Sequence, residues 1–112
     1  MKTFPLSPYR NAGSHHYISG QIGQINGQLV SDEIGKQTLQ AIDNVATILK
    51  QNGLGMTDIV DVTVFLTEQD DYEAFNDAYR SSLKDPLPTR TTVTVKSLPL
   101  GARVELKVVA FK

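Results

Sequence analysis

The stretch that decides the fold is IVDVTVFL, residues 59–66, where apolar side chains recur at every second position. Successive side chains of a β-strand point to opposite faces, so this alternation is typical of a strand with one covered face. The aliphatic face carries Val60, Val62, Val64 and Leu66, and the opposite face carries Asp61, Thr63 and Phe65. We therefore expect a central strand whose aliphatic face packs against other elements.

A helix is expected before this strand, from Glu33 to about Gln51, because the apolar period changes there to three and four residues. The stripe consists of Leu39, Ile42, Val45, Ala46 and Leu49. Ser31 and Asp32 can cap the start of this helix. Asn52-Gly53 supplies the left-handed residue that commonly ends a helix, so we expect the chain to turn back there.

A second helix is expected after the strand, because another apolar stripe recurs at helical spacing. Its members are Tyr72, Phe75, Tyr79 and Leu83. Thr67 and Asp70 resemble a capping box in which Asp replaces the usual Glu or Gln. The segment KDPLP, residues 84–88, is expected to end this helix because proline disfavours continuation.

Further strands are expected at 15–22, 91–95 and 104–111, with a tight hairpin turn at Asn26-Gly27. The order β-β-α-β-α-β-β predicts an α+β fold, a mixed sheet with two helices on one face. Helical crossovers favour parallel pairing, and the last two strands favour an antiparallel hairpin. The open face would carry Phe65, Val109 and Phe111 among threonines, which indicates cover by another subunit.

The composition limits the class of protein. A chain of 112 residues, 40% hydrophobic and 21% charged, predicts one globular domain spanning residues 1–112. It has no apolar run near the roughly 20 residues of a membrane helix. MKTFPLSPYR has no apolar segment of about 7 to 15 residues, so we do not expect a secretory signal. The absence of cysteine excludes disulfides and favours a cytoplasmic protein. A net charge of −1 with scattered basic residues argues against nucleic-acid binding.

Arg90 is the first candidate for chemistry. Alternation in PTRTTVTV, residues 88–95, places it with Thr92 and Thr94, opposite Val93 and Val95, on the face expected to point away from the helices. By the same rule Glu105 projects from that face of the last strand. A guanidinium suits a small carboxylate ligand, and a nearby carboxylate can orient a water. The alternative, favoured by the pattern alone, is a cross-strand salt bridge worth about 0 to 1 kcal/mol.

Other candidate sites have weaker support. His15 and His16 are adjacent on a strand and point to opposite faces, so they do not predict a metal site. A serine triad through Ser19 lacks any supporting motif. The glycines at 20, 23 and 27 do not follow the dinucleotide-binding spacing. Gly20 instead lets the backbone approach a ligand closely or forms a turn or bulge.

Three segments together resemble the YjgF/RidA family of reactive-intermediate deaminases: YISGQIG, VDVTVFLTEQDDYEAFNDAY and PTRTTVTVKSLPLGARVELKVVA. The resemblance runs from about residue 17 to the end. It implies a chorismate-mutase-like fold with six strands and two helices, assembled as a homotrimer with ligand clefts between subunits. It also implies hydrolysis of 2-imino acids to 2-keto acids and ammonia, with neither a cofactor nor a metal.

The resemblance assigns roles to particular residues. Arg90 would hold the substrate carboxylate, and Glu105 would help to place the attacking water. The other positions that match the site or its surroundings are Ser19, Gly20, Phe65, Tyr79 and Thr92, the last of which stands where well-known members have cysteine. A non-catalytic trimer that binds small carboxylates is the alternative, and an RNA-cleaving translation inhibitor is a third hypothesis.

Overall fold

The structure is a computed structural model that describes residues 4–112, so the first three residues of MKTFPLSPYR lie outside it. The strands are β1 Tyr9–Ala12, β2 His15–Ile22, β3 Gln24–Ile25, β4 Gln28–Leu29, β5 Ile59–Leu66, β6 Thr89–Thr94 and β7 Val104–Phe111. The α-helices are α1 Ile34–Gln51 and α2 Tyr72–Ser82, and short 3-10 turns lie at Met56–Asp58, Gln69–Asp71 and Pro99–Gly101. Neither α1 nor α2, nor any other helix in residues 4–112, is long and apolar enough to cross a membrane.

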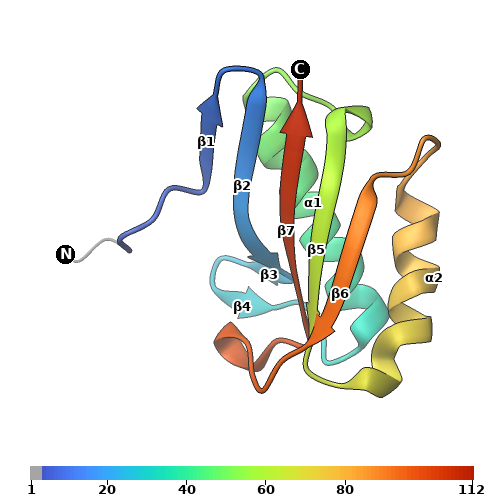
Figure 1. Ribbon diagram of the computed structural model, residues 1–112. Coiled ribbons are helices and arrows are strands. Elements are labelled where there is room, and N and C mark those ends of the chain that lie inside the picture. The colour runs from blue at the N-terminus through green and yellow to red at the C-terminus, as the bar shows by residue number, and fades with distance from the viewer. Residues whose placement is uncertain (1–3) are drawn as a thin grey trace.

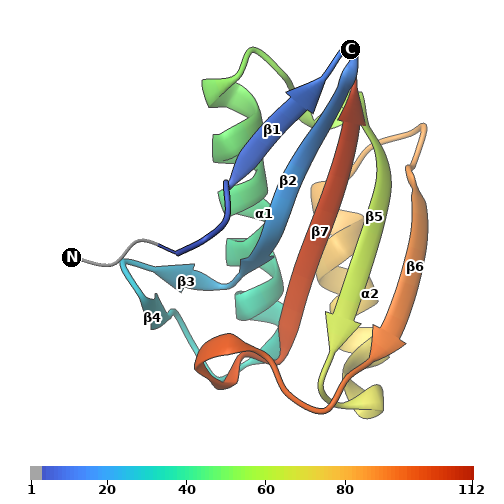
Figure 2. The same ribbon diagram turned by 60° about the vertical axis from the view of Figure 1, so that its left-hand side comes forward.

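The main sheet has the strand order β1-β2-β7-β5-β6, and both helices cover one face of it (Figures 1 and 2). The pair β5–β6 is parallel and the other three pairs are antiparallel. The expected α+β fold with a mixed sheet is confirmed. The sheet has five strands rather than six, because β3 and β4 form a separate two-stranded ribbon around the predicted Asn26-Gly27 turn.

The last two strands do not form the expected hairpin. After α2 crosses the sheet, β6 pairs in parallel with one edge of β5, and β7 occupies the other edge. Because β5 lies between them, the segment that contains Pro99–Gly101 must carry the chain past the end of β5 (Figure 2). The result places β6 at the edge of the sheet, where only one of its sides is paired.

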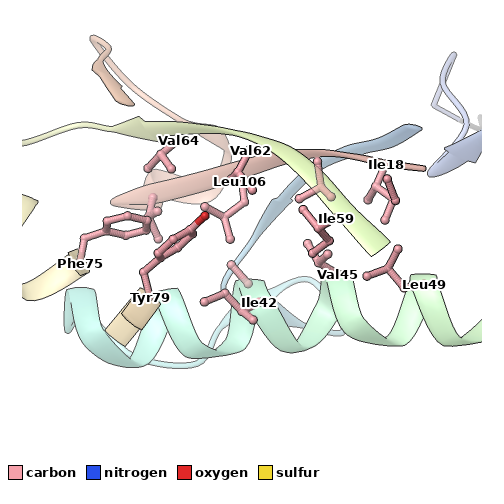
Figure 3. Close-up of a cluster of buried hydrophobic side chains, with 14 of the residues drawn as sticks. Ile18, Ile42, Val45, Leu49, Ile59, Val62, Val64, Phe75, Tyr79 and Leu106 are labelled. Carbon is pink, nitrogen blue, oxygen red and sulfur yellow. The ribbon is translucent and has the colours of Figure 1, made fainter. Parts of the chain in front are cut away.

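The core lies between the sheet and the two helices (Figure 3). Val62, Val64 and Leu66 of β5 are buried as predicted, and Phe75 and Tyr79 reach them from α2. Val60 is 45% exposed, so its assignment to the core is wrong. An irregularity in the pairing of β5 with β7 between residues 59 and 61 shifts the alternation by one position, and Ile59 is buried instead.

Helix α1 begins and ends close to the predicted bounds. Gly53 has φ of +76°, which is the left-handed residue expected after the helix. The predicted stripe is wrong at Leu39, which is exposed, because the covered face also contains Gln37 and Thr38. The Gln37 side chain spans two segments: its amide donates to the carbonyl of Ser31 at 2.9 Å, and its oxygen accepts from the backbone N–H of Arg103 at 2.8 Å.

The start of α2 differs from the predicted capping box. Thr67 precedes the 3-10 turn, and α2 begins at Tyr72 without a side-chain cap. The buried carboxylate of Asp71 instead accepts two hydrogen bonds from Arg103, from Nη2 at 2.7 Å and from Nε at 2.9 Å. This ion pair joins the start of α2 to the segment before β7.

Candidate active site

Arg90 lies against α2. In the parallel β5–β6 pair, Arg90 is opposite Val62 and Thr92 is opposite Val64, so both share the helix-covered face with those buried valines. The Cζ atom of Arg90 lies over three aromatic rings of α2, 4.9 Å from the centroid of Tyr79, 5.3 Å from that of Phe75 and 5.7 Å from that of Tyr72. Its Nη2 also donates a hydrogen bond of 3.3 Å to the hydroxyl of Tyr72.

The prediction that Arg90 points away from the helices is therefore wrong. Alternation placed Val93 toward the core because valine is apolar, but Val93 lies opposite Phe65 on the open face and is exposed. In an edge strand the polarity of a residue indicates its face poorly, because neither face is fully covered. The three rings of α2 make the helix side favourable for the cation through cation–π attraction.

Arg90 has no acidic partner among the residues that the structure describes. The ion pairs within residues 4–112 are Glu33–Lys36, Asp77–Arg80 and Asp71–Arg103. The salt bridge with Glu105, favoured by the sequence pattern alone, is accordingly not formed within the chain. Aromatic rings cover the guanidinium without neutralising its charge, so this cation can still bind a carboxylate through its N–H groups.

Tyr79 lies beneath Arg90 and is buried. Burial raises the pKa of the Tyr79 phenol, the charge of Arg90 lowers it in part, and Asp61 raises it further. Within the described chain its hydroxyl has no hydrogen-bond partner. Tyr79 is therefore a neutral phenol that supports Arg90 with its ring.

Glu105 lies on the opposite, open face. Along β7 the buried residues alternate with Glu105, Lys107 and Val109, as the sequence predicted, and Glu105 is opposite Phe65 of β5. Burial raises the pKa of the Glu105 carboxyl above its ordinary value. Its carboxylate forms no ion pair within residues 4–112.

Because Gly20 has no Cβ atom, the side chain of Glu105 can pack directly against its backbone. A Cβ atom at position 20 would collide with the Glu105 carboxyl group. The β2–β7 register is irregular between Ile18 and Gln21, so Ser19 and Gly20 form a bulge. The hydroxyl of Ser19 donates to the carbonyl of Ser7 at 2.6 Å, which ties this bulge to the segment before β1.

The predicted site residues thus form two groups. Arg90, Thr92 and Tyr79 lie on the helix side at the sheet edge, whereas Glu105, Gly20 and Phe65 lie on or against the open face, with Ser19 next to Gly20. The prediction that Arg90 and Glu105 project from the same side of the sheet is wrong. Because the sheet separates them, one chain does not bring the two side chains onto one small ligand.

A groove of about 560 Å³ lies between the start of α2 and β6, and we call it the β6 groove. Arg90 does not line it but donates a hydrogen bond to Tyr72, which does. Its lining consists of Leu66, Gln69, Asp70, Tyr72, Glu73, Thr92 and Thr94. The hydroxyl of Thr92 is buried and has no partner among residues 4–112. The sequence pattern did not indicate Tyr72 and Phe75 as neighbours of Arg90. Their spacing with Tyr79 on one helical face, together with a β-α-β crossover, was the available signal.

The histidines point apart, as predicted. His15 packs edge-on against Phe111 with ring centroids 5.2 Å apart, and His16 Nδ1 forms a 2.7 Å hydrogen bond with the hydroxyl of Tyr9. The described residues contain no group of three or more His, Asp or Glu side chains that could hold a metal ion.

The family model described as "Endoribonuclease L-PSP" matches residues 2–112 of the chain. The chain belongs to this family. The match covers both groups of candidate residues, and the resemblance to the YjgF/RidA family stated from the sequence is confirmed.

Curated relatives of this L-PSP family carry different names. The "2-iminobutanoate/2-iminopropanoate deaminase" of Homo sapiens is 39% identical over 98 residues, which cover 86% of this chain and 72% of the human protein. The protein "mmf1, mitochondrial" of Schizosaccharomyces pombe is 37% identical over 99 residues. That match covers 86% of this chain and 61% of mmf1, so this chain spans less than two thirds of that relative.

A solved structure gives the same fold. A protein of unknown function from the conserved Rid family of Yersinia pestis is 36% identical and superposes with a TM-score of 0.94. The superposition covers 99% of this chain and 90% of that one. The separation of Arg90 from Glu105 therefore occurs in a chain with the ordinary fold of the family.

Proposed function

We propose that the protein hydrolyses 2-imino acids to 2-keto acids and ammonia. The observation that carries this proposal is Arg90, a half-buried guanidinium that rests on three aromatic rings and has no carboxylate partner in residues 4–112. Such a cation suits the planar carboxylate common to all 2-imino acids. The names of several relatives, including the human deaminase, support the same class of substrate.

Hydrolysis of an imine needs little beyond binding and a placed water. The imine carbon is already electrophilic, so a water can add to it and form a carbinolamine. Transfer of a proton to the amine and cleavage of the C–N bond then release ammonia and leave the keto acid. Glu105 is suited to accept the proton of the water and to return one to the leaving amine, because burial raises its pKa above the ordinary value for a carboxyl group and makes it a stronger base.

The separation of Arg90 from Glu105 supports a site built from two copies of the chain. Arg90 and Glu105 lie on opposite faces of the sheet, and the open face exposes Tyr17, Val93 and Phe111. Such a face favours cover by another subunit. We propose a homotrimer in which Arg90 of one copy and Glu105 of a neighbouring copy act on the same substrate, with the cleft between the subunits.

The test measures release of keto acid from an imine that an amino-acid oxidase generates in the same solution. We expect the wild type to accelerate release and Arg90→Ala to reduce the acceleration about 10- to 100-fold, the value of charge-assisted hydrogen bonds to a carboxylate. Arg80→Ala is the matched control, because Arg80 is an exposed arginine of α2 that pairs only with Asp77. Absence of acceleration by the wild type, or equal rates for Arg90→Ala, would contradict the proposal.

A second candidate function is the binding of small carboxylates without turnover. It is favoured because one chain already joins Arg90, Tyr72 and Thr92 beside the β6 groove, whereas Glu105 lies elsewhere. Tight binding of 2-oxobutanoate with no imine hydrolysis would support this candidate. RNA cleavage gains little support, because Asp70 and Glu73 line the groove and would repel a phosphate backbone.

A further inference from the structure

Tyr72 is the only ring around Arg90 that also reaches the β6 groove. It is the first residue of α2 and its side chain is 45% exposed. Its hydroxyl accepts the 3.3 Å hydrogen bond from Arg90 Nη2, and its ring lies 5.7 Å from Cζ of Arg90. Tyr72 therefore links the cation to the space that a ligand can enter.

The other two rings fix the cation from behind. Phe75 is fully buried and Tyr79 is 7% exposed, so neither ring lines the groove. They pack against each other with centroids 5.4 Å apart, and Figure 3 shows both reaching from α2 into the core. Because these rings are held by the core, the guanidinium has a fixed support, and Tyr72 forms the solvent-side wall.

We propose that Tyr72 is a substrate-binding residue that donates a hydrogen bond to the carboxylate held by Arg90. This inference rests on the proposed role of Arg90 as the carboxylate anchor. It goes beyond that role because it assigns a second donor, from the first turn of α2, and places the bound carboxylate at the mouth of the β6 groove.

The direction of the known hydrogen bond supports this assignment. A phenol oxygen that accepts from a guanidinium still carries its own proton, which it can donate. The exposed position of Tyr72 leaves that proton facing water or ligand. Thr92, two residues from Arg90 on the same face, lines the same groove, but its hydroxyl is buried. A small acid at this position would thus meet the guanidinium with the exposed hydroxyl of Tyr72 beside it.

The experiment compares the affinity of the intact protein for 2-oxobutanoate in the wild type and in Tyr72→Phe, by titration calorimetry. The substitution keeps the ring and removes only the hydroxyl. We expect the dissociation constant to rise about five- to tenfold, as for loss of one ordinary hydrogen bond at a half-exposed position. In the imine assay we expect the same change in KM with kcat nearly unchanged, because the hydroxyl holds the carboxylate and not the reacting carbon.

Tyr17→Phe is the matched control. Tyr17 is a tyrosine with similar exposure, 41%, whose ring also lies 5.7 Å from a cation, Nζ of Lys107, but on the open face. We expect this variant to bind 2-oxobutanoate like the wild type. Equal weakening in both variants would overturn the inference, since the effect would then be general to exposed phenols.

Arg90→Ala separates this inference from the proposed function. If Arg90→Ala abolishes binding and Tyr72→Phe binds like the wild type, the role of Tyr72 is wrong and the carboxylate anchor stands. If Arg90→Ala binds like the wild type, the anchor itself is wrong. A melting temperature of Tyr72→Phe equal to that of the wild type would show that any lost affinity does not come from unfolding.

Discussion

At the scale of single residues, Glu105 links the chemistry to the stability of the fold. Burial raises its pKa above the ordinary value of 4.5, so the folded protein holds this proton to a higher pH than the unfolded chain does. The folded state therefore loses stability as the pH rises through the folded pKa, because the buried carboxyl must ionise. Below 4.5 both states are protonated and the effect is absent.

The loss of stability with rising pH gives a direct prediction for Glu105→Gln. The variant keeps the size of the side chain and cannot ionise, so we expect its stability relative to the wild type to increase as the pH rises above 4.5 and to level off beyond the raised pKa. Melting temperatures of both proteins, taken between about pH 4 and 8, measure this difference. Parallel curves over that range would show that burial does not perturb this carboxyl.

At the scale of elements, the ion pair between Asp71 and Arg103 fixes the start of α2 and hence the rings around Arg90. Asp71 is buried, whereas Arg103 is half-exposed and also donates to the carbonyl of Asp32. Arg103→Met would keep much of the side-chain volume but leave the Asp71 carboxylate uncompensated. We expect a loss of about 2 to 4 kcal/mol in the free energy of unfolding, measured with urea.

A matched variant tests the reason for that loss. Arg80→Met removes an exposed pair at the other end of α2, where the partner Asp77 remains solvated. We expect it to change the free energy of unfolding by less than about 0.5 kcal/mol. Similar losses in the two variants would indicate that burial of Asp71 is not the cause.

The elements with strong periodicity were predictable from the sequence. The second helix, the Asn26-Gly27 turn and the alternation of β7 depend on local pattern, and the structure has all three. The predicted stripe of α2 is buried at Phe75 and Tyr79, but Tyr72 is exposed and Leu83 lies just after the helix. The strand order was not predictable in this way, because it depends on which edge of β5 each later strand occupies. The shift at Val60 follows from an irregular register that no local pattern indicates.

The site was predictable as a set of residues but not as an arrangement. Arg90 and Glu105 were found from motif and alternation, yet the face of Arg90 was wrong because β6 is an edge strand whose apolar residues do not mark the core. Arg90 instead lies on the face covered by α2, where it makes cation–π contacts with three rings of that helix. These contacts depend on tertiary packing. The contact of Tyr72 with Arg90 depends on the packing of α2 against β6, which no local pattern indicates.

At the scale of the whole molecule, the proposed reaction needs a site shared between copies. The sheet separates Arg90 from Glu105 in one chain, and the open face carries exposed apolar groups such as Tyr17 and Phe111. In the homotrimer that we propose, the β6 edge of one copy lies against the open face of the next. Each proposed site therefore takes Arg90 from one copy and Glu105 from a neighbouring copy.

Hybrid oligomers test this claim most directly. Arg90→Ala and Glu105→Gln are each expected to keep no more than about a tenth of the wild-type rate alone, and coexpression would mix them within one assembly. If each site takes Arg90 from one copy and Glu105 from its neighbour, random mixing restores about a quarter of the sites, so imine hydrolysis should reappear at about a quarter of the wild-type rate. Coexpressed assemblies shown to contain both variants, yet no more active than either variant alone, would contradict the shared site.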